Sequence, residues 1–306
     1  MNLPTCTKCK SQPSVFFRGY SGERLCKDCF IKSIIERVQR SINIYEMLEH
    51  SSKIAIGVSG GKDSLTLLHV LKIIEDNTHG SEIVAITIDE GIKGYREEAL
   101  KIVKKNTRLL DLEWVHISFK KLFGISMDEI AAKTTRSLGS CSYCGVLRRR
   151  ALNTAAKSIG ADRLATGHTL DDMAQSAILN LIRGDLSKMH SLLPGGINQD
   201  GFVRRIKPLC EVPERETALF AYLSGFEFQS MSCPYAEEAI RNDARAWLND
   251  MEEKRPGIMF TTFRTALKMM PQLKSTNLKA CEFCGEPTAG SSCRVCQMVM
   301  DGNIRV

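Results

Sequence analysis

The feature that most constrains the fold is an alternation of short β-branched runs with segments of helical periodicity. In chain order, strand-like and helical segments follow one another at 53–59, 63–75, 82–89, 95–111, 113–118, 144–159, 162–166 and 171–183. A further strand near 202–206 and a helix at 214–224 continue the pattern. Such alternation is typical of βαβ units and predicts an α/β fold, a doubly wound parallel sheet with helices on both faces. Ligands of such sheets bind at the carboxyl ends of the strands.

A glycine-rich loop lies between the first strand and the first helix of this alternation. It reads Val58-Ser59-Gly60-Gly61-Lys62-Asp63-Ser64. Its glycines let backbone amides approach an anion, the helix N-terminus adds the positive end of its dipole, and the lysine is a mobile charge. An ordinary glycine turn is the alternative, but strand, helix and lysine together favour a phosphate-binding loop. The spacing from first glycine to lysine is too short for a Walker P-loop.

Ten of the twelve cysteines fall in Cys-x-x-Cys pairs. Two pairs near each end form four-cysteine groups, Cys6, Cys9, Cys26 and Cys29 in the first and Cys281, Cys284, Cys293 and Cys296 in the second. This spacing brings thiolates to one metal ion, so we expect one Zn²⁺ in each group rather than a disulfide scaffold. We name these groups the N-terminal finger and the C-terminal finger.

The fifth pair, Cys141 and Cys144, lies at the start of the helix that carries Arg148. A helix N-terminus and arginines lower the pKa of a thiol, so thiolates are expected there. A third zinc site or a redox dithiol is the alternative. Cys233 stands apart and could be a buried, inert residue, and Cys210 is expected in the core.

A second polar segment, Gly167-His168-Thr169-Leu170-Asp171-Asp172, follows the strand at 162–166. Asp171 and Asp172 could hold Mg²⁺, or they could do no more than cap the next helix.

The loop at 59–64 resembles the signature of the PP-loop ATP pyrophosphatases, which cleave ATP between the α and β phosphates. The segment 167–172 is similar to the Gly-His-x-x-Asp-Asp segment of RNA-modifying members of that superfamily. The order of fingers, loop, cysteine pair and third cysteine resembles the tRNA 2-thiouridine synthetases, a family of tRNA sulfurtransferases, over essentially the whole chain. Two departures are the all-cysteine first finger and Thr169, where an asparagine is common.

The resemblance implies a [4Fe-4S] cluster on Cys141, Cys144 and Cys233, with a persulfide mechanism on the same cysteines as the alternative. It implies catalytic roles for these three cysteines and Lys62. It also implies ATP and Mg²⁺ bound by Val58, Ser59, Gly60, Gly61, Lys62, Asp63, Ser64, Ile88, Arg148, Gly167, His168, Asp171 and Asp172. The expected partners are tRNA, a second copy of the chain in a homodimer, and either free sulfide or a ubiquitin-like sulfur carrier.

The formal net charge is +7, and four basic segments could face RNA or form solvated helix faces. They are 148–150, Lys120 with Lys121, Arg204-Arg205 with Lys207, and the series Lys268, Lys274 and Lys279. Apolar runs are strand-sized, and a Cys-x-x-Cys stands where a leader would need an apolar stretch, so no membrane span and a cytoplasmic location are expected.

The expected domains are an N-terminal zinc finger at 1–32, a linker helix at 33–52, a PP-loop domain at 53–235, a helical region at 236–277 and a C-terminal zinc finger at 278–306. The expected reaction is adenylation of the C2 carbonyl oxygen of a tRNA uridine and its replacement by sulfur. The alternatives are a tRNA 2-thiocytidine synthetase, a lysidine or amide-forming ligase without need of the three cysteines, and a zinc-ribbon adapter that binds RNA without catalysis.

Overall fold

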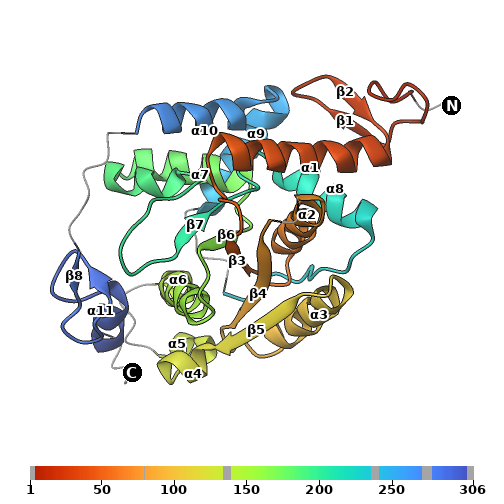
Figure 1. Cartoon of the computed structure of the whole chain (residues 1–306). Coiled ribbons are helices and arrows are strands. Elements are labelled where there is room, and N and C mark those ends of the chain that lie inside the picture. Colours follow the sequence, from red (N-terminus) through yellow and green to blue (C-terminus); the bar gives the residue numbers. More distant parts are fainter. Residues whose placement is uncertain (1–3, 79, 134–138, 236–240, 271–277, 302–306) are drawn as a thin grey trace.

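The structure is a computed structural model that describes residues 4–78, 80–133, 139–235, 241–270 and 278–301 (Figure 1). Lys274 of the fourth basic segment lies outside these ranges, as do the ends of several expected domains. Within the described ranges, none of the helices combines the length and the apolar character that a bilayer crossing requires.

A five-stranded parallel sheet forms the centre of the chain. Its spatial order is β5 (Glu113–Ser118), β4 (Glu82–Asp89), β3 (Lys53–Gly57), β6 (Arg163–Thr166) and β7 (Arg204–Ile206). The predicted α/β fold is confirmed. From β3 the chain first builds outward through β4 and β5, and it later returns to the other side of β3 with β6. This reversal places the expected ligand crevice at the carboxyl end of β3.

Successive residues of each strand face opposite layers, because side chains alternate along a strand. Ile54 and Ile56 belong to one buried cluster, whereas Ala55 between them belongs to the other. The helices that contribute to the first cluster are α1 (Lys27–Ile44), α2 (Lys62–Thr78), α3 (Arg96–Leu109), α7 (Leu170–Ile182), α8 (Glu214–Ser224), α9 (Arg241–Lys254) and α10 (Ile258–Lys268). The second cluster contains α4 (Phe119–Phe123), α5 (Met127–Ala131), α6 (Ser140–Ser158) and α11 (Arg294–Asp301).

Two helices begin earlier than their periodicity predicts. Helix α1 starts at Lys27 rather than near residue 33, with Cys26 at its N-cap and Phe30 already fully buried. The second cysteine pair of the N-terminal finger therefore lies on the first turn of this helix. Helix α6 likewise starts at Ser140, so Cys141 and Cys144 both lie in its first turns.

The fingers lie on opposite sides of the central domain (Figure 1). The N-terminal finger contains the hairpin β1 (Phe16–Arg18) and β2 (Glu23–Leu25) beside α1. The C-terminal finger contains β8 (Lys279–Ala280) and β9 (Pro287–Thr288) and ends in α11, which packs on α6. Helices α4 and α5 and the 3₁₀ helix η1 (Leu186–Leu192) are too short to show periodicity in the sequence.

Candidate active site

The glycine-rich loop connects β3 to α2 at the point where the sheet order reverses. The Ser64 hydroxyl accepts a hydrogen bond from Ser59 N at 3.1 Å and donates one to Gly61 O at 2.9 Å, which ties the loop to the first helical turn. Gly60 has a φ of 94°, and a Cβ there would lie 3.0 Å from the carbonyl oxygen of Ala99. The loop conformation therefore requires glycine at position 60.

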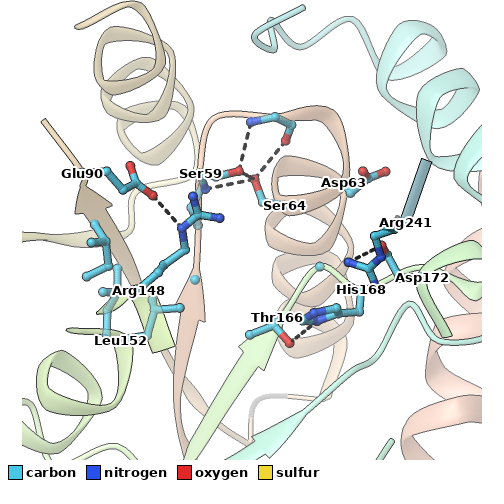
Figure 2. A pocket seen from close by; sticks show the side chains of 16 residues that line it. Ser59, Asp63, Ser64, Glu90, Arg148, Leu152, Thr166, His168, Asp172 and Arg241 are labelled. Carbon is cyan, nitrogen blue, oxygen red and sulfur yellow. Dashed lines mark hydrogen bonds and ion pairs between the residues drawn. The ribbon is translucent and has the colours of Figure 1, made fainter. Parts of the chain in front are cut away.

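The loop opens onto a cavity of about 290 Å³ at the carboxyl ends of β3, β4 and β6 (Figure 2). This size is near the lower end of the range for ligand pockets, roughly 300–1,000 Å³. The lining residues expected from the sequence are Val58, Ser59, Gly61, Asp63, Ser64, Ile88, Arg148, Gly167, His168 and Asp172. Their residue types suit a nucleotide, because apolar strand ends lie beside backbone amides and cations.

Lys62 does not line this cavity. Its Nζ lies 2.7 Å from Glu214 Oε1 and 3.0 Å from Asp63 Oδ2, and its side chain lines a neighbouring cavity on the α8 side. The other Asp63 oxygen accepts a hydrogen bond from the Thr217 hydroxyl. Burial of Asp63 raises the pKa of its carboxyl despite the nearby Lys62. The lysine and aspartate of the loop are therefore both bound to the start of α8.

The segment after β6 forms the opposite wall of the cavity. A Cβ on Gly167 would lie 3.0 Å from Ser64 N, so this glycine allows β6 to approach the phosphate loop. Thr166 Oγ1 donates toward Ile206 O at 3.4 Å and lies 2.8 Å from His168 Nδ1. In the tautomer in which Nδ1 donates to Thr166 and Thr166 donates to Ile206, Nε2 is an acceptor. Burial, together with nearby cations, lowers the pKa of His168 to about 4, so the ring is neutral at pH 7.

The two aspartates of this segment point to different places. Asp172 closes a capping box with Thr169, whose backbone N lies 3.1 Å from Asp172 Oδ2, and it also lines the cavity. Asp171 accepts a hydrogen bond from Glu214 N at 2.7 Å and lines the neighbouring cavity instead. Burial raises the pKa of Asp171 to about 6. The structure therefore does not bring the two carboxylates together around one position.

A chain of charged groups runs from the loop to α6, and Figure 2 shows its central ion pair between Glu90 and Arg148. Arg96 donates to Ser59 O at 3.0 Å, and its Nε lies 2.9 Å from Glu90 Oε2. The other Glu90 oxygen lies 2.6 Å from Arg148 Nε, and Arg148 Nη2 donates to Cys144 Sγ at 3.1 Å. Arg148 thus joins the wall of the nucleotide cavity to the cysteine pair.

Three further cysteines, Cys141, Cys144 and Cys233, lie near the start of α6. Cys141 Sγ donates to Tyr235 O at 3.0 Å, two residues beyond Cys233. Cys144 and Cys233 both pack against the cluster under α6. Among the described residues, these three sulfur atoms do not form a group within 4.8 Å of one another, a spacing that suits the larger iron–sulfur cube better than a single ion.

The predicted lowering of the thiol pKa is wrong for Cys144. Burial raises its pKa to about 11, with Glu90 and Cys233 acting in the same direction, and this outweighs the opposing effect of Arg148. Cys144 is therefore a thiol at neutral pH unless a bound cation withdraws its proton.

Both fingers have the geometry of a metal site. In each group the four sulfur atoms lie within 4.8 Å of one another. In the C-terminal finger, Cys293 N donates to Cys281 Sγ at 3.2 Å, a contact that stabilises a thiolate ligand. Each four-cysteine group therefore fits one tetrahedral ion. Cys210 is fully buried in the core, as expected.

Several residues of the cavity were not found by sequence reasoning. Glu90 had an available signal, because a carboxylate directly after a buried strand lies at the ligand-binding edge of a parallel sheet. Arg96, Thr217 and Arg241 reach the site from α3, α8 and α9 without any local motif.

Comparison with known proteins places this fold and loop in a class. A model described as a PP-loop domain matches residues 33–251, and one described as the N-terminal LIM domain of the 2-thiouridine synthetase TtuA matches residues 5–31. The class is therefore that of the PP-loop proteins.

Relatives cover almost the whole chain. Cytoplasmic tRNA 2-thiolation protein 1 of Aspergillus niger is 34% identical over 300 residues, which span 96% of this chain and 87% of the relative. The tRNA 2-thiolation protein NcsA of Haloferax volcanii is 35% identical over 319 residues, with 96% and 98% covered. The solved structure of the U34-tRNA thiolase NcsA from Methanococcus maripaludis with its [4Fe-4S] cluster is 32% identical, covers 100% of this chain and 98% of that one, and superposes with a TM-score of 0.87. The chain belongs to the family of tRNA 2-thiolation proteins.

Proposed function

We propose that this protein is an ATP-dependent tRNA sulfurtransferase that converts a tRNA uridine to 2-thiouridine. The observation that carries the proposal is Arg148, which lines the cavity of the phosphate loop and also contacts Cys144. A nucleotide bound to the loop and a sulfur source held by the cysteines would therefore meet at one side chain. The relatives named for tRNA 2-thiolation support this reading.

The reaction uses the groups of the cavity in two steps. The uridine O2 attacks the α-phosphorus of ATP, the bond to the β-phosphate breaks, and pyrophosphate leaves while the N3 proton departs. His168 lines the cavity and can relay that proton to solvent, because its pKa of about 4 prevents it from keeping the proton at neutral pH. Hydrosulfide then adds at C2, the C2–O bond breaks with loss of AMP, and the proton of the hydrosulfide ends on N3. Loop amides and Arg148 stabilise the charge on the phosphates. Lys62 reaches them by leaving Glu214.

The residues Cys141, Cys144 and Cys233 would hold a [4Fe-4S] cluster. The cluster would supply a Lewis-acid iron without a protein ligand, which can hold sulfide. The metal-free alternative places a persulfide on one of these cysteines.

The remaining components follow from the donor sets and the family. Zn²⁺ would occupy both fingers, because closed four-cysteine sites are typical of structural zinc. Mg²⁺ would bind between the nucleotide phosphates and the Asp172 side of the cavity. We further propose the domain boundaries given above, a homodimer, a cytoplasmic location, and sulfur from free sulfide or a ubiquitin-like carrier.

Separation of the two steps tests the function. In the Cys233→Ala variant, anaerobically reconstituted, we expect pyrophosphate release with ATP and tRNA to persist while 2-thiouridine, measured by mass spectrometry of nucleosides, falls at least a hundredfold. Lys62→Ala should instead lose pyrophosphate release. Cys210→Ala, a buried cysteine outside the site, is the matched control and should retain both steps.

Three results would contradict the proposal. Thiolation of cytidine by the wild type would favour a 2-thiocytidine synthetase. Absence of pyrophosphate release would favour an RNA-binding adapter. Thiolation by Cys233→Ala would remove the cysteine group from the reaction.

A further inference from the structure

Two basic segments that are far apart in the sequence, 148–150 and 204–207, lie close together in the structure. Most of their cations have hydrogen-bond or ion-pair partners. Arg148 pairs with Glu90, and Arg150 pairs with Glu286 of the C-terminal finger. Arg204 donates to the carbonyl oxygens of Gly195 and Glu46. Arg149 and Arg205 differ, because no carboxylate in the described part of the chain pairs with either.

The sheet register determines where Arg205 points. Arg205 of β7 is paired with Leu164 of β6, and in a parallel sheet paired residues face the same layer. Leu164 belongs to the cluster under α6, whereas the next pair, Ala165 and Ile206, belongs to the opposite cluster. Arg205 therefore projects toward the α6 layer.

Helix α6 places Arg149 over the same position. Asn153 of α6 accepts a hydrogen bond from Val203 N at 2.9 Å and donates to Gly201 O at 3.3 Å, which fixes the helix against the start of β7. Arg149 lies one turn before Asn153 and Arg205 two residues after Val203. Because α6 runs antiparallel to the strands, one turn back along the helix and two residues forward along the strand lead in the same direction. The two displacements are about 6 Å and about 6.6 Å, so Arg149 lies over Arg205.

The two guanidinium groups are consequently close neighbours of like charge. The Arg205 Nε is buried and has no hydrogen-bond partner among the described residues. Burial and the facing charge of Arg149 lower the pKa of Arg205, and burial with Arg148 lowers that of Arg149. Lys207, two residues after Arg205, is also buried, and among the described residues its Nζ donates to the carbonyl oxygens of Ser191 and Leu193 and to no carboxylate. Arg149 is exposed and Arg205 is half-buried, so solvent screens part of this repulsion, and an anion bound between the two guanidinium groups would remove the remainder.

We propose that Arg149 and Arg205 form a binding site for a backbone phosphate of the RNA substrate. The inference rests on the proposed function. Neither arginine lines the nucleotide cavity, and the phosphate loop has its own amides for the phosphates of ATP. Arg205 is near enough to His168, which lines the cavity, to add to the lowering of its pKa by burial, so a phosphate held by the pair would deliver an adjacent nucleotide to the cavity. Two guanidinium groups present the planar forks that suit phosphate oxygens.

The test measures equilibrium binding of unmodified tRNA, by fluorescence anisotropy across a salt series, to the full-length wild type and variants. For Arg149→Gln with Arg205→Gln we expect affinity to fall on the order of tenfold and the slope of log K against log salt to decrease by about 1. Arg149→Lys with Arg205→Lys, which keeps the charges, should restore the slope. Arg108→Gln, an exposed arginine on α3 in the opposite layer, is the matched control and should change neither value.

A second measurement distinguishes the two sources of phosphate and a structural role. ATP affinity of the double Gln variant should equal that of the wild type, and its melting temperature should not fall, since a repulsion has been removed. Loss of ATP affinity with unchanged tRNA binding would show that the pair serves the nucleotide, and would overturn the proposal. An unchanged salt slope, or a lower melting temperature with equal losses for both ligands, would overturn it too. Failure of the proposed function would appear separately, as a wild type that makes no 2-thiouridine.

Discussion

Each finger contains four cysteines, yet the two attach to the central domain by different means. The N-terminal finger is joined through Arg18, which is 2% exposed and lies 2.7 Å from the fully buried Glu216 of α8. Tyr20 donates to the same carboxylate, and Arg37 lies 3.8 Å from it. The C-terminal finger is joined mainly by apolar packing of α11 on α6, where Met298 is 3% exposed. A partly exposed ion pair, Arg150 with Glu286, accompanies this contact.

This difference links each finger to a different half of the site. Glu216 lies on the first turns of α8, between Glu214, which holds Lys62, and Thr217, which holds Asp63. The N-terminal finger therefore supports the helix behind the phosphate loop. The C-terminal finger supports α6, which carries Cys141, Cys144 and Arg148. The comparison indicates that each finger orders one half of the cavity.

The largest effect is expected for Glu216→Gln. It leaves Arg18 and Arg37 buried beside a neutral side chain, and breaking a buried ion pair costs about 3–5 kcal/mol of the free energy of unfolding. Chemical denaturation, zinc release from the N-terminal finger and pyrophosphate release measure the result. Glu23→Gln removes an exposed carboxylate 2.9 Å from the same Arg18 and should cost under about 1 kcal/mol. Equal losses in the two variants would contradict the buried attachment.

An intermediate effect is expected for Met298→Ala. Truncation of a buried methionine leaves a cavity between α11 and α6 and costs about 2–3 kcal/mol. Iron binding by Cys141 and Cys144 should weaken. Pyrophosphate release should be retained, because the phosphate loop leads into α2 and not into α6. Met300→Ala on the same helix, 48% exposed in the wild type, is the control and should be neutral. Loss of pyrophosphate release without loss of iron would contradict the inference that the C-terminal finger supports α6.

The smallest effect is expected for Glu286→Gln. The side chains of Arg150 and Glu286 are 21% and 18% exposed, so solvent screens the pair and its loss should cost below about 1 kcal/mol. The melting temperature and zinc content measure the change. A loss as large as that of Glu216→Gln would remove the contrast between the fingers.

Local signals in the sequence determined much of the fold. The strands predicted at 82–89 and 113–118 and the helix at 214–224 have the observed bounds. The length and β-branched composition of the two strands, and the helical spacing of the apolar residues in 214–224, distinguish them. The phosphate loop and the cysteine pairs were also visible, because their chemistry depends on residues that are close along the chain. The starts of α1 and α6 were misplaced, since burial against the core extends both helices past their periodic segments.

Only the tertiary structure decided how the charged residues are shared among partners. Arg148, Arg149 and Arg150 are identical and adjacent in sequence, yet one pairs with Glu90, one with Glu286 and one faces Arg205. Arg18 and Glu216 are 198 positions apart. Charge acts through space, and a sequence does not state which distant carboxylate a folded cation will meet. The same reason separates Asp171 from Asp172 and turns Lys62 toward Glu214, although all three stand in the motifs that revealed the site.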